Sequence, residues 1–89
     1  MLAVVLGWVL WHSSVTTTPE GDAWTPAQRL RRVESVRACV AARAEEMARL
    51  RSAHVDAVPV TSPTGLLVRE GQRATIHLYY CLPSHARLD

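Results

Sequence analysis

Residues Pro26 to Val55, PAQRLRRVESVRACVAARAEEMARLRSAHV, decide the fold class that we expect for this chain. No glycine or proline interrupts the stretch after Pro26, and it is rich in alanine, arginine, glutamate and leucine, which are strong helix formers. Thr25 offers a hydroxyl at the N-cap, Pro26 suits the first helical position, and Gln28 completes a capping box. The sequence therefore predicts one long amphipathic helix that begins at Pro26.

At helical spacing the predicted helix has one broad apolar face. Its members are Leu30, Val33, Val36, Val40, Ala44, Met47, Leu50 and His54. Arg43 and Arg51 intrude on this face, where their stems can cover apolar surface while the guanidinium groups reach a partner. We treat Arg43 and Arg51 as candidate partner-binding residues; the alternative is an ordinary solvated surface, because Glu45 and Glu46 dilute the positive charge.

A β-hairpin is expected after the helix. Residues Leu66 to Arg69 and Arg73 to Leu82 read as two antiparallel strands joined at Glu70-Gly71-Gln72, where glycine can adopt a positive φ. An earlier weak strand within residues 55–60 is limited to a sheet edge by Pro59, and residues 61–65 form a turn. The alternating apolar residues of the last strand are the expected surface for the helix: Ala74, Ile76, Leu78, Tyr80 and Leu82.

The two cysteines, Cys39 and Cys81, lie in different predicted elements. An even count in a small exported chain favours a disulfide, which would close a loop of about 42 residues and stabilise the fold by roughly 3–4 kcal/mol. Cys81 alternates onto the polar side of its strand, so we expect a bulge near Tyr79-Tyr80, or a twist of the strand end, to turn it toward the helix. Two separate buried thiols are the alternative.

Metal binding and catalysis have little support in the sequence. Cys81 and His85 have the spacing of half a zinc site, with Cys39, His54 and His77 as companions, but CxxC, HxxxH and HExxH are absent. We expect no metal ligand, no cofactor and no catalytic residue. The formal net charge of +2 is too weak to predict nucleic-acid binding.

The apolar start, MLAVVLGWVLW at residues 1–11, carries no charge. It resembles the apolar core of a signal peptide, with small residues at Gly21-Asp22-Ala23 for cleavage, although no basic residue precedes it. A membrane anchor needs about 20 apolar residues; further residues upstream would supply the missing length and the basic flank. A strand or helix of a soluble core is the remaining alternative. The arginines all follow the segment, which conflicts with an exported orientation under the positive-inside rule.

The expected fold is α+β, with an N-terminal apolar segment and one long amphipathic helix packed on a small antiparallel hairpin or three-stranded sheet. We divide the chain into a signal peptide or membrane anchor (1–15), a polar linker (16–25), the helix and hairpin module (26–83) and a tail (84–89). The expected function is that of a small non-enzymatic protein of a bacterial-type cell envelope, periplasmic and exported or membrane-anchored, with a structural or interaction role and an unidentified protein partner. The alternatives are a single-span accessory subunit of a larger membrane complex and a cytoplasmic protein that responds to thiols or metals.

Overall fold

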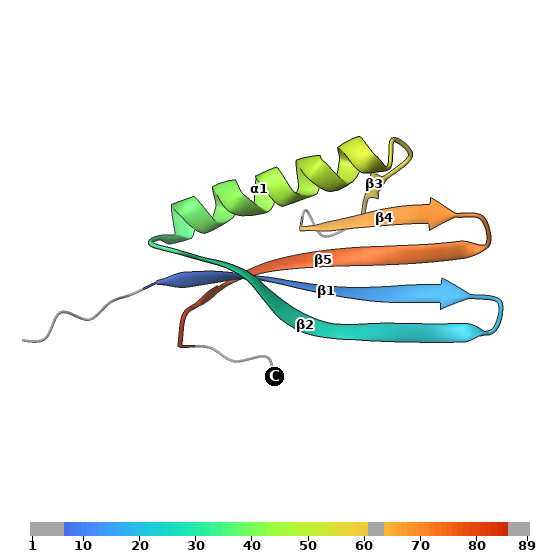
Figure 1. Ribbon diagram of the computed structural model, residues 1–89, viewed down its shortest axis with the longest axis horizontal. Helices are drawn as coiled ribbons and strands as arrows, with labels where there is room; N and C mark the ends of the chain where they lie inside the picture. Colours follow the sequence, from blue (N-terminus) through green and yellow to red (C-terminus); the bar gives the residue numbers. More distant parts are fainter. Residues whose placement is uncertain (1–6, 61–63, 86–89) are drawn as a thin grey trace, which may run out of the picture.

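The computed structural model describes residues 7–60 and 64–85, which form one helix and one sheet (Figure 1). In chain order the elements are β1 (Trp8–Thr18), β2 (Gly21–Val33), α1 (Val36–Ala53), β3 (Val58–Pro59), β4 (Gly65–Glu70) and β5 (Arg73–Pro83). Within the described residues the sheet has five antiparallel strands in the order β2-β1-β5-β4-β3. The α+β class is confirmed, but the sheet is larger than the predicted hairpin.

The predicted start of the helix is wrong. Residues 26–33 belong to β2, and α1 begins at Val36 behind Ser35, whose Oγ accepts a hydrogen bond from the Ala38 N–H at 3.1 Å. Pro26 is tolerated because β2 is an edge strand and because its pairing with β1 is irregular between His12 and Ser14. Strand pairing with β1 thus overrides the local helix propensity of residues 26–33.

The N-terminal apolar residues, as far as they are described, lie within the sheet. Trp8–Thr18 forms β1, which pairs with β2 on one side and with β5 on the other. The predicted polar linker at residues 16–25 is wrong, because these residues form the β1–β2 hairpin, with Gly21 at a φ of 134°. Cleavage after Ala23 would remove β1 from between its two neighbours. No helix among the described residues is long and apolar enough to cross a membrane. Residues 1–6 lie outside the described part.

The C-terminal hairpin is confirmed. Strands β4 and β5 pair from Glu70–Arg73 to Gly65–Leu78, and Gly71 in the turn has a φ of +63°. Pro59 lies in β3, at the sheet edge, as its missing N–H predicts. The predicted turn at residues 61–65 and the predicted tail at 84–89 fall partly outside the described residues.

The helix covers the face of the sheet opposite to the predicted one. Leu10 in β1 and Tyr79 in β5 are buried against Cys39 and Ala42 of α1. Around this core pack the partly buried residues Trp8, Val33, Met47, Leu50 and Cys81. By the strand register, Ile76, Leu78, Tyr80 and Leu82 point to the other side, which no described element covers (Figure 1). We call this other side the open face.

Candidate functional site

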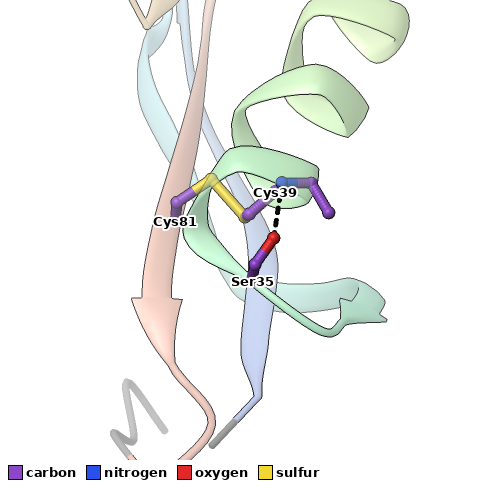
Figure 2. Close-up of a disulfide and its surroundings, with 4 residues drawn as sticks. Ser35, Cys39 and Cys81 are labelled. Carbon is purple, nitrogen blue, oxygen red and sulfur yellow. Dashed lines mark hydrogen bonds between the residues drawn. A yellow bond between two sulfur atoms is a disulfide. The ribbon is translucent and has the colours of Figure 1, made fainter.

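A disulfide joins Cys39 in the first turns of α1 to Cys81 near the end of β5 (Figure 2). The two Cα atoms are 6.0 Å apart, and Cys39 is fully buried. The Cys39 N–H also donates to the Ser35 carbonyl oxygen at 3.0 Å, so the bonded cysteine lies in a regular helical turn. The structure therefore contains the disulfide that the sequence predicted.

The disulfide needs no bulge. The register of β1 with β5 is continuous, and it places Cys81 opposite Leu10 on the covered face. The predicted conflict arose because the helix was assigned to the apolar side of β5. The helix instead packs on the side of Thr75, His77, Tyr79 and Cys81.

The buried side of α1 is also rotated from the predicted apolar face. Cys39 and Ala42 are buried, whereas Val36 is 47% exposed and Val40 is 42% exposed. Small side chains at positions 39 and 42 let the helix backbone approach the sheet, and the disulfide fixes this rotation about the helix axis. Cys39 is therefore central to the helix–sheet contact, not at its margin.

The candidate partner-binding arginines are not brought together as a site. Arg43 is half-buried and Arg51 is exposed in the last turn of α1. In the described part of the chain neither one forms an ion pair; the ion pairs present are Arg31–Glu45 at 3.2 Å and Arg49–Glu46 at 3.3 Å. Partner binding by Arg43 and Arg51 stays a prediction.

A histidine pair lies on the covered face. His12 Nε2 and His77 Nδ1 are 2.9 Å apart, and the two rings stack with centroids 5.2 Å apart. The ring of Tyr79 lies against His12, with a centroid separation of 4.9 Å. A hydrogen bond between two imidazoles needs one N–H donor and one lone pair, so it requires a neutral acceptor ring.

Burial determines the protonation state of this cluster. Desolvation lowers the pKa of His12, against the opposing attraction of Glu46. Desolvation, followed by repulsion from His12 and His54, lowers the pKa of His77, while Glu70 acts in the opposite direction. Burial and then Glu46 raise the pKa of Tyr79. At neutral pH the cluster is therefore an uncharged polar contact beneath the helix.

The cluster offers little for chemistry. The described residues contain no group of three His, Cys, Asp or Glu side chains placed to hold a metal ion, and both cysteines are bonded to each other. The expected companions of Cys81, namely His54, His77 and His85, do not meet it in such a group. The His12–His77 pair was not predictable from the sequence, because that contact depends on the register of β1 with β5.

The open face carries an apolar surface that was predicted to lie in the core. Trp24 in β2 is 69% exposed, and the β5 residues Ile76, Leu78, Tyr80 and Leu82 are partly exposed. A hollow of about 410 Å³ lies on this face and is lined by Ser13, Trp24, Ala27, Tyr80 and Leu82. Ser13, a small residue of β1, is one of the lining residues. Its Oγ donates to the Tyr80 hydroxyl at 3.3 Å.

Arginines border the open face. The Arg29 guanidinium carbon lies 5.1 Å from the centroid of the Trp11 ring, which favours a cation–π contact. Trp11 is only 2% exposed, and its buried Nε1 has no hydrogen-bond acceptor among the described residues. Arg32 pairs with Val9, and Arg69 pairs with Ala74, so the register assigns both arginines to the open face.

No protein-family model, curated protein or solved structure matches this chain. Two features of the described residues stand out: a helix fixed by a disulfide on one side of the sheet, and an apolar, arginine-bordered open face on the other.

Proposed function

We propose that the protein is a non-enzymatic interaction module of an extracytoplasmic compartment, and that it binds its partner through the open face. The observation that carries this proposal is the exposure of Trp24 beside the β5 residues Tyr80 and Leu82. Large contiguous apolar patches are uncommon on monomeric soluble proteins and mark sites of interaction. Tryptophan, tyrosine and arginine are also the residue types that are enriched where proteins bind partners.

The disulfide supports both the compartment and the role. Stable structural disulfides belong to oxidising environments, and they are frequent in small domains with limited cores. The Cys39–Cys81 bond ties α1 to the covered face. The fold can therefore be stable with a small core on that side, while the open face of the sheet stays exposed. In this proposal the protein binds a partner and catalyses no reaction.

A second candidate function is that of an accessory subunit docked through the helix on a larger membrane complex. The exposed apolar residues Val36 and Val40 on the outer side of α1 favour it, because the sheet leaves them uncovered. Arg43 and Arg51 would border such a contact. The two candidates differ in which side of the molecule meets the partner.

A photo-cross-linking side chain placed at one position at a time tests both candidates in cells that naturally contain the protein. We expect adducts from position 24 on the open face and none from position 40 on the helix. Adducts from position 40 alone would support the accessory subunit, and the absence of adducts at both positions would contradict both. Alkylation without reductant should find no free thiol; two reactive cysteines would contradict an oxidising compartment.

A further inference from the structure

The open face has a defined chemistry, and from it we infer that this face binds the surface of a membrane that contains anionic lipid. This inference rests on the proposed function, because it names the partner of the same face. Three observations support the inference. They are the positive charge of the open face, its exposed tryptophan and hollow, and the apolar sequence that precedes β1.

The charge of the open face is predominantly positive. The strand register places Arg29, Arg32 and Arg69 on it, against the single acidic residue Asp22 opposite Thr17. None of these three arginines has an ion-pair or hydrogen-bond partner among residues 7–60 and 64–85. Two copies meeting by their open faces would bring the arginines together, so the charge disfavours a second copy and favours an anionic surface.

The apolar part of the face suits the region between lipid headgroups and acyl chains. Trp24 is 69% exposed and lines the hollow together with Tyr80 and Leu82. Amphipathic aromatic rings collect at this depth of a bilayer, and arginines extend from there to phosphate groups. The hollow of about 410 Å³ gives space for part of an acyl chain beside these rings.

The sequence ahead of β1 distinguishes a membrane from an acidic protein partner. Residues 1–7 are uncharged and mostly apolar, and they reach β1 at Gly7. A Cβ added at Gly7 would lie 3.2 Å from the Arg32 Nε, so the chain enters the sheet beside an arginine of the open face. An uncharged apolar sequence next to basic residues favours a lipid surface over a charged protein surface.

The test is co-sedimentation of the oxidised full chain with vesicles of phosphatidylcholine alone or mixed with phosphatidylglycerol. We expect binding to the mixed vesicles, weaker binding at high salt, and little binding to phosphatidylcholine alone. Replacing two arginines of the open face, Arg32→Glu with Arg69→Glu, should weaken binding at least about tenfold, because each basic residue near the surface attracts anionic lipid.

Trp24→Ala should also weaken vesicle binding, and it should abolish the blue shift of tryptophan fluorescence on binding.

Matched controls change the same charge and the same kind of apolar residue elsewhere. Arg37→Glu with Arg49→Glu makes the same charge change on α1, and Val55→Ser alters a side chain that is 88% exposed outside the open face. Both should bind as the wild type does, and circular dichroism should show all variants folded. Should the pair on α1 lose binding as strongly as the open-face pair, the inference fails.

Absence of wild-type binding to the mixed vesicles, or equal binding to both vesicle types, also overturns the inference. The proposed function has a separate outcome: an adduct between position 24 and a protein in cells, with no vesicle binding, would retain the interaction module and assign the open face to a protein. Vesicle binding with lipid adducts at position 24 supports both statements.

Discussion

His12 and His77 make the contact beneath the helix that depends most directly on protonation. Their hydrogen bond of 2.9 Å requires a neutral acceptor, and desolvation is the main cause that lowers the pKa of each ring below its ordinary value of 6.5. The groups around them have opposed effects: Glu46 and Glu70 favour the protonated rings, while His54 disfavours protonated His77. For both rings the effect of desolvation is larger than that of the carboxylates.

The free energy of unfolding should therefore fall as the pH drops below 6.5. In that range the unfolded chain binds protons at His12 and His77 that the folded chain does not, so stability rises with pH and is lost as pH falls through the lower folded values. Urea denaturation at several pH values between about 5 and 8 measures this slope. His77→Gln should flatten it, whereas His85→Gln should keep it, because the His12–His77 pair is then intact. A wild-type slope of zero would contradict the prediction.

At the scale of elements, the rotation of α1 about its axis predicts opposite effects of the same substitution at a buried and at an exposed helix position. Ala42 is 2% exposed in the core, and Val40 is 42% exposed on the outer side. Ala42→Asp should destabilise the protein by more than about 3 kcal/mol, because it buries a carboxylate without a partner. Val40→Asp should change stability by less than about 0.5 kcal/mol. Thermal unfolding distinguishes them; a large loss for Val40→Asp would mean that the helix packs by its predicted apolar face.

The same elements show what sequence alone can predict. The β4–β5 hairpin was predictable because Gly71 and the apolar alternation around it are local features. The helix was predictable from Val36 onward. Its start was wrongly predicted at Pro26, because the capping pattern at residues 25–28 lies in the edge strand β2. β1 was missed because an uncharged run such as residues 1–11 suits a membrane, a signal peptide or a central strand equally.

For the candidate site too, the predictable features are those that do not depend on the strand register. The Cys39–Cys81 pair followed from the cysteine count, which requires no knowledge of the register. The His12–His77 pair and the open face depend on which residues of β1 and β5 face α1, and alternation alone assigned the wrong side. The apolar side of β5 was expected to be core, whereas the disulfide and the small residues of α1 hold the helix on the other side.

For the whole molecule, the disulfide connects two parts of the chain that meet in one sheet. Its loop spans 42 positions and contains most of α1 and β5 together with all of β3 and β4, while β1 and β2 lie outside it. β1 joins the two parts, because it pairs with β2 on one side and β5 on the other. The bond therefore restricts the unfolded chain over nearly half its length, and it fixes the helix on the covered face.

Loss of this bond should cost about 4 kcal/mol, from the entropy of a closed loop of this length. Cys39→Ser and Cys81→Ser should each destabilise by that amount, and the double variant should lose no more than about 1 kcal/mol beyond either, because the bond is removed only once. Urea denaturation measures all three, and the wild type unfolded in reductant should match the double variant. Additive losses would show two independent buried thiols. Equal, non-additive losses would show that the two cysteines stabilise the fold as a single covalent tie between α1 and β5.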